Sequence, residues 1–239
     1  MKKNKGFSIN AKGKELDIYL FEEIGAGWLG GISAKRFAED LKAAGSPSQI
    51  NLHINSPGGS VFDGIAIYNT LRKNKARVVV DIDGLAASIA SVVAMAGDEI
   101  RMAENAMLMI HDPWIVTAGS AAELRETADL MDKTKDSLIK SYSAQTQLAV
   151  EEISELMAAE TWMSADEAME YGFIDSVTEE VKLAACFDPT RLYSYRNPPE
   201  RLIESLLEKN AASAAEKPKL DAYRNKRTRI KGFLKKRNW

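Results

Sequence analysis

The sequence has little of what metal sites, disulfides and nucleotide sites require. Its 239 residues include one cysteine, Cys186, and two histidines, His53 and His111. A single cysteine cannot form an internal disulfide, which is typical of a reducing compartment. There is no CxxC, HxxxH or GxxxxGK[ST] pattern, and "GAGWLGG" at 25–31 has the GxGxxG spacing but lacks the strand-to-helix context that a dinucleotide site requires. We therefore predict no metal site and no cofactor.

Long hydrophobic runs are also missing. No segment approaches the roughly 18 apolar residues needed to cross a membrane. Residues 1–17 have the positive start of a signal peptide but no apolar segment after it. We expect a soluble, cytoplasmic protein with no membrane partner. With 45% hydrophobic and 28% charged residues, the composition fits one globular domain with an appendage.

The charge is unevenly distributed, although the net charge is only −2. Residues 188–239 contain fourteen Lys/Arg and six Asp/Glu, a local charge of +8. Residues 1–187 consequently carry −10. We predict a domain over 1–187 and a basic, partly flexible C-terminal extension over 188–239, in which Pro198–Pro199 and "NAASAAEKPK" interrupt regular structure.

Strand-like and helix-like segments alternate along the acidic part. Ile50, Leu52 and Ile54 alternate with polar residues as in a half-buried strand. Ser164 with Glu167 forms a capping-box pattern for a helix. The predicted strands are 15–24, 49–55, 76–84, 99–105 and 106–114, and the predicted helices are 33–45, 61–74, 91–97, 119–148, 149–160 and 164–172. This order predicts an α/β domain with a mainly parallel sheet.

The predicted helix 119–148 is long and has a single apolar stripe. The stripe consists of Leu124, Ala128, Met131, Leu138 and Tyr142, and Lys135 interrupts it. A long helix with one apolar stripe packs on more than its own hairpin, so the pattern favours contact with a partner subunit.

Ser88 and His111 are the first candidates for chemistry. Ser88 lies in the Ala-rich run 83–97, which is compatible either with a buried helix or with a crowded turn that presents one hydroxyl. A serine needs an adjacent base to act as a nucleophile. His111 ends an apolar strand, where α/β sheets place their sites, whereas His53 lies mid-strand and is interpreted as a packing residue.

Three stretches taken together resemble the ClpP family of self-compartmentalising serine peptidases. They are "INSPGGSVFDGIAIYNTL", "DGLAASIASVVAMAGDEIRMAENAMLMIHDP" and "ETWMSADEAMEYGFIDSV", in the order of the family. "FDGIAIYNTL" and "AAETWMSADEA" look like the phage-type branch, the ClpP-related head maturation proteases. The resemblance implies the ClpP/crotonase-like spiral α/β fold, with helix 119–148 as the protruding handle between stacked rings and with the basic C-terminal tail outside the match.

The resemblance also implies catalytic roles. Ser88 would be the nucleophile and His111 the general base. The third position, usually aspartate in the family, holds Glu160 here. A glutamate is one methylene longer, so it must approach His111 from a slightly retracted backbone. Asp112 is a rival acid, but adjacent strand residues point to opposite faces, which favours a loop role for it.

The family's backbone groups complete the implied site. The N–H groups of Gly58 and Ile89 would form the oxyanion hole. Peptide substrates would lie as an added strand beside the "SPGG" segment, at Pro57 and Gly59.

The resulting hypothesis is a serine endopeptidase that processes phage capsid or scaffold proteins in the host cytoplasm. It would act on protein or peptide substrates as a homo-oligomeric ring, a heptamer or a stacked tetradecamer, with Clp ATPase, capsid or portal proteins as partners. The alternatives are a housekeeping ATP-dependent Clp proteolytic subunit, a crotonase-type acyl-CoA enzyme and an inactive scaffold or assembly protein.

Overall fold

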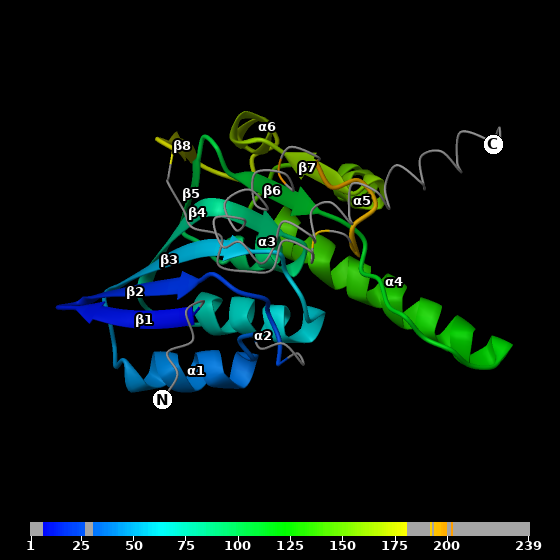
Figure 1. The fold of residues 1–239 in the computed structure, drawn as a ribbon, viewed down its shortest axis with the longest axis horizontal. Coiled ribbons are helices and arrows are strands. Elements are labelled where there is room, and N and C mark those ends of the chain that lie inside the picture. Colours follow the sequence, from blue (N-terminus) through cyan, green and yellow to red (C-terminus); the bar gives the residue numbers. More distant parts are fainter. Residues whose placement is uncertain (1–6, 27–30, 181–191, 193, 200–201, 203–239) are drawn as a thin grey trace, which may run out of the picture. The chain divides into compact units, whose positions relative to one another are not determined.

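A computed structural model describes residues 7–26, 31–180, 192, 194–199 and 202 (Figure 1). The chain divides into two compact units, residues 1–187 and 188–239. Nearly all of the predicted basic extension, like Cys186, lies outside the described residues. The fold below is that of the first unit.

The described part of the first unit is built on an eight-stranded, mainly parallel sheet with the order β1-β2-β3-β4-β5-β8. Its strands are β1 (Phe7–Lys12), β2 (Glu15–Leu20), β3 (Gln49–Ser56), β4 (Arg77–Ala87), β5 (Glu99–Ala103), β6 (Met107–Ile110), β7 (Thr161–Met163) and β8 (Ser176–Thr178). The β1–β2 and β6–β7 pairs are antiparallel, and the other pairs are parallel. The predicted α/β class is confirmed.

Along one of its two edges, strand β4 pairs with two different strands in succession. Its first part pairs with β5 at Val79–Ile82, and its last part pairs with β6 at Leu85–Ala87. The neighbouring strand β3 shifts register between Ile54 and Ser56, close to the same point. The β4 chain end is therefore directed away from β5 and toward β6, which positions the residue that follows it, Ser88.

Six helices in the described residues complete the unit. They are α1 (Ala34–Ala43), α2 (Val61–Arg72), α3 (Ile89–Ala94), α4 (Ala121–Ser143), α5 (Val150–Ala159) and α6 (Ala165–Glu170). The predicted capping box is present at α6, where the Ser164 side chain accepts the Glu167 N–H and the Glu167 carboxylate accepts the Ser164 N–H. Ser33 caps α1 by accepting the Arg36 N–H. Local sequence therefore determines these helix starts.

Helix α4 extends away from the sheet (Figure 1). Its C-terminal part is anchored in the core by Leu138, Ile139 and Tyr142, which are buried. Its N-terminal part is not covered by the described chain, since Leu124 is 44% and Leu130 55% exposed. The apolar stripe thus has one half in the core and one half at the surface.

Several predicted boundaries are wrong. The first strand is β1, not 15–24, and β2 already ends at Leu20. Strand 106–114 ends at Ile110, because the chain turns at Asp112–Pro113. The strand predicted over 76–84 continues to Ala87 in β4. The three-residue strands β7 and β8 were too short to give a period.

Gly64 of α2 lies against Ile89, the first residue of α3. A Cβ at position 64 would lie 2.1 Å from Ile89 Cγ1. We expect Gly64→Ala to lower the free energy of unfolding by about 2 kcal/mol, since overpacking outweighs the gain in helix propensity. Urea denaturation followed by circular dichroism measures this change. The exposed Asn69→Ala in the same helix serves as the control, and an equal or higher stability of Gly64→Ala would contradict the packing argument.

Candidate active site

Ser88 occupies a strained junction between β4 and α3. Its backbone has φ 56° and ψ −129°, a region that residues with a Cβ rarely adopt. The residues around it are small and buried, including Ala86, Ala87 and Ala90. Such strain costs about 1–3 kcal/mol and persists where the surroundings enforce it, often at functional sites. Both sequence interpretations are therefore partly correct, because a presented serine directly precedes a buried helix.

His111 lies within hydrogen-bonding distance of Ser88. The Ser88 Oγ and His111 Nε2 atoms are 2.8 Å apart. The sheet creates this proximity, because β4 pairs with β6 in the register Ala87↔Met109 and the Ser88 N–H donates to the Met109 carbonyl. His111, one residue after β6, is buried. The structure thus brings together the first two predicted site residues, which are 23 positions apart in sequence.

Glu160 directly precedes β7, the strand that pairs with β6. The β6–β7 pair is antiparallel with Ile110 opposite Thr161, so the next residues along this register are His111 and Glu160. Glu160 ends α5 in the left-handed conformation, with φ 55°, and is buried. Its carboxylate accepts a hydrogen bond from Trp162 Nε1 at 3.4 Å. A glutamate in a conformation that favours glycine is a local strain at the expected acid position.

Asp112, the rival acid, is engaged elsewhere. Its Oδ1 lies 2.8 Å from Lys135 Nζ of α4, and its N–H donates to the Met157 carbonyl of α5. The structure therefore places Asp112 in contact with both α4 and α5.

Gly58 lies directly beside Ser88. A Cβ at this position would be 2.8 Å from Ser88 Cβ and 3.3 Å from the Ile89 nitrogen, and Gly58 has φ +91°. Only glycine combines this conformation with so close an approach. The Gly58 N–H donates to Ser56 Oγ at 3.2 Å, and Ser56 Oγ donates to the Glu22 carbonyl. The two predicted oxyanion residues are thus adjacent, with one N–H engaged by a hydroxyl.

Gly59 also depends on the absence of a side chain. With φ +143°, it would place a Cβ 2.1 Å from the Ile24 carbonyl oxygen. The Gly58 carbonyl accepts the Ile24 N–H, which fixes this loop to the segment after β2. Pro57 is buried at the start of the same loop.

A small cleft opens over the pair. The residues that line it are Gly59, Val61, Ser88, Ile89, Val92, His111, Pro113, Trp114, Leu138 and Tyr142. Trp114 is 57% exposed and is followed by the exposed Ile115 and Val116, so apolar surface continues from the cleft along the segment after His111.

Helix α4 supports Ser88 through a buried hydrogen-bond chain that the sequence did not indicate. The Tyr142 hydroxyl and Ser91 Oγ are 2.9 Å apart, and Ser91 Oγ donates to the Ser88 carbonyl. Burial raises the pKa of Tyr142 above its usual range, so the phenol stays neutral. The strained Ser88 backbone is thereby tied to the anchored end of α4.

His53 has a different environment. Its Nδ1 lies 3.0 Å from Asp83 Oδ2, and its ring stacks on Tyr19 with centroids 4.7 Å apart. Burial lowers the pKa of His53, but the hydrogen bond and the charge of Asp83 outweigh burial and raise the pKa overall. These contacts fit the packing role expected from the sequence.

Among the described residues, no three His, Cys, Asp or Glu side chains are grouped in a way that could hold a metal ion. Within the same residues, no helix has the length and hydrophobicity to span a membrane.

Comparison with known proteins agrees with this geometry. The Clp protease family matches residues 13–181, a range that contains Ser88, His111 and Glu160. The ATP-dependent Clp protease proteolytic subunit 1 of Salinibacter ruber is 35% identical over 147 residues, which cover 61% of this chain and 63% of that protein. The ATP-dependent Clp protease proteolytic subunit of Deinococcus radiodurans is 37% identical over 144 residues, or 59% of this chain and 71% of that protein. The matched part of the chain covers less than two thirds of the length of the first of these relatives. Because the family match extends over more than half of its residues, the chain belongs to the Clp protease family.

Proposed function

We propose that the chain is a serine endopeptidase in which Ser88 is the nucleophile, His111 the general base and Glu160 the acid that orients His111. The observation that carries this proposal is the 2.8 Å contact between Ser88 Oγ and His111 Nε2 at a strained junction. A hydroxyl beside a neutral imidazole nitrogen is the arrangement that activates serine. A crotonase-type site has no need of such a pair.

The mechanism follows from these positions. His111 Nε2 takes the proton of Ser88 as Oγ bonds to the peptide carbonyl carbon, and the proton then passes to the leaving amine as the C–N bond breaks. Water, deprotonated by His111, hydrolyses the acyl-enzyme and regenerates Ser88. For Nε2 to accept a proton, Nδ1 must carry one, and the acceptor we assign to it is Glu160, which precedes the Thr161 that pairs with Ile110.

The N–H groups of Gly58 and Ile89 would stabilise the oxyanion. Ile89 is the first residue of α3, where N–H groups have no partner within the helix. The Gly58 N–H already donates to Ser56 Oγ. A charged oxygen is a stronger acceptor than a hydroxyl, so we expect this N–H to turn toward the intermediate.

Gly58→Ala tests the oxyanion assignment. The added methyl group would press against Ser88 Cβ and the Ala87 carbonyl, displacing the Gly58 N–H. We expect kcat for a fluorogenic peptide to fall about 100-fold. Gly45→Ala, at an open position of similar φ, is the matched control for strain alone. Equal losses in the two variants would contradict the oxyanion role.

The substrate would bind as an extended strand beside Pro57 and Gly59. This loop offers backbone groups with little side-chain bulk, and the cleft next to it has apolar walls formed by Val61 and Trp114. Backbone hydrogen bonds to an added strand bind peptides without selecting one sequence. These features support a protein or peptide as the substrate.

Assembly into a homo-oligomeric ring, as a heptamer or a stacked tetradecamer, is part of this proposal. The exposed Leu124 and Leu130 of α4 support it, because exposed apolar side chains on a protruding helix favour a protein partner. Helix α4 would be the handle between rings.

Two biological settings are compatible with this chemistry, both in the cytoplasm. One is head maturation, in which a phage-encoded protease cleaves capsid or scaffold proteins, with portal proteins nearby. The other is that of a housekeeping proteolytic subunit with a Clp ATPase as partner, which fits the names of the two relatives as subunits of an ATP-dependent Clp protease. The sequence features of the phage-type branch favour the first.

Cleavage assays separate the settings. The chain is incubated with casein alone, with casein plus a Clp ATPase and ATP, and with a phage capsid precursor. Head maturation predicts cleavage of the precursor without ATPase, whereas the housekeeping role predicts that casein is cleaved much faster with ATPase and ATP than alone. No cleavage in any arm would contradict the peptidase assignment and favour the inactive scaffold protein.

A further inference from the structure

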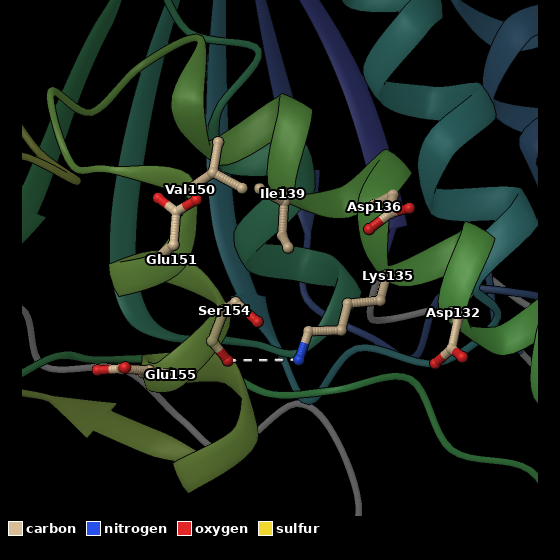
Figure 2. A pocket seen from close by; sticks show the side chains of 8 residues that line it. All are labelled: Asp132, Lys135, Asp136, Ile139, Val150, Glu151, Ser154 and Glu155. Carbon is tan, nitrogen blue, oxygen red and sulfur yellow. Dashed lines mark hydrogen bonds between the residues drawn. The ribbon is translucent and has the colours of Figure 1, made fainter.

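Lys135 interrupts the apolar stripe of α4, and its side chain joins three segments. The side chain is only 20% exposed, and Nζ lies 2.8 Å from Asp112 Oδ1. The same ammonium donates to the Ser154 carbonyl of α5 at 3.4 Å, as Figure 2 shows. Lys135 therefore links α4, α5 and the residue that follows His111.

These are the segments that place the proposed base and acid. Beyond Ile110 the chain has left the β6 ladder, so other contacts must hold His111. Asp112 supplies two of them, through its N–H on the Met157 carbonyl and its carboxylate beside Lys135. Helix α5, which Lys135 also contacts, ends at Glu160.

The surroundings of Lys135 make its charge important. It lines a pocket of about 450 Å³ between α4 and α5, together with four carboxylates (Figure 2). The lining residues are Asp132, Lys135, Asp136, Ile139, Val150, Glu151, Ser154 and Glu155. Removal of the ammonium would leave the Asp112 carboxylate without the cation that balances it. Asp112 and the adjoining His111 would then lose their connection to α4.

We propose that Lys135 is a positioning residue that holds His111 in place through Asp112. This inference rests on the proposed peptidase function and adds to it a residue outside the site. A partly exposed ion pair contributes little to global stability, so its loss should affect geometry at His111 more than folding. Displacement of a catalytic group by a fraction of an ångström is costly for the rate.

Kinetics provide the first test. We expect Lys135→Met to lower kcat about tenfold while KM changes by less than about twofold, because the substrate cleft itself is intact. Lys135→Arg should recover most of kcat, and the double variant Lys135→Met/Asp112→Asn should be no slower than Lys135→Met alone. Lys133→Met, an exposed lysine of the same helix, is the control. Unchanged kcat in Lys135→Met, or losses that multiply in the double variant, would overturn the inference.

Histidine NMR tests the same coupling without any activity. The chain has two histidines, so a ¹³Cε1-histidine-labelled sample gives two signals, and His53 is an internal reference. Lys135→Met should shift or broaden the His111 signal and leave that of His53 unchanged, whereas Lys133→Met should alter neither. An unchanged His111 signal would refute the positioning role. An inactive wild-type chain would instead refute the proposed function, and the histidine signals would still decide the role of Lys135.

Discussion

The Ser88→Ala variant is expected to lose peptide hydrolysis by a factor on the order of 10⁴ or more, because Ser88 is the only serine among the described residues that line the cleft. Its fold and assembly should be unchanged, since the hydroxyl contacts His111 at the surface of the cleft and carries no core packing. The measurement is kcat/KM for a fluorogenic peptide, with sedimentation velocity as the check on assembly.

A matched control excludes a general effect of removing serine hydroxyls. Ser137→Ala changes an exposed serine of α4 and should retain wild-type kcat/KM. Retained cleavage by Ser88→Ala, at more than about one per cent of wild type, would show that another group performs the chemistry.

Glu160→Gln is expected to lower kcat about 10³-fold with little change in KM. The amide has the size of the carboxylate, but it carries no charge to stabilise the imidazolium that forms on His111. It can also donate to Nδ1 and so favour the wrong tautomer. Helix α5 should be unaffected, because the main chain forms the Glu160 N–H hydrogen bond to Met157. Steady-state kinetics over a range of pH measure the effect.

Two further variants serve as comparisons for the Glu160→Gln result. Glu152→Gln, at an exposed position of α5, should behave as wild type. Glu160→Asp introduces the residue usual in the family and retains the charge, so it should be faster than Glu160→Gln. A Glu160→Gln enzyme within about threefold of wild type would remove Glu160 from the mechanism and favour a Ser88–His111 pair acting alone.

Much of the fold could be predicted because its signals are local. The alternation of Ile50, Leu52 and Ile54 indicates β3, and the Ser164–Glu167 pattern indicates the start of α6. Features that depend on partners far along the chain escaped prediction. The division of β4 between β5 and β6 is of this kind, as are the three-residue strands β7 and β8, which are stable only as additions to neighbours.

The candidate site also combines features that could be predicted from the sequence with features that could not. Ser88, His111 and Glu160 could be proposed from motifs, and the structure brings Ser88 and His111 together. The positive φ values of Ser88 and Glu160 could not be predicted, because both residues normally avoid this region and only the surrounding fold enforces it. The sequence gives one sign that α4 has a polar contact near the site, because Lys135 interrupts its apolar stripe. Its partner Asp112 is known only from the structure.

The most direct test of the central claim is the reaction of the chain with a fluorophosphonate, followed by peptide mass spectrometry. We expect one stoichiometric adduct on Ser88, which forms much more slowly in His111→Gln and is absent in Ser88→Ala. An unlabelled wild-type chain, or an adduct on a different serine, would contradict the assignment of Ser88 as an activated nucleophile.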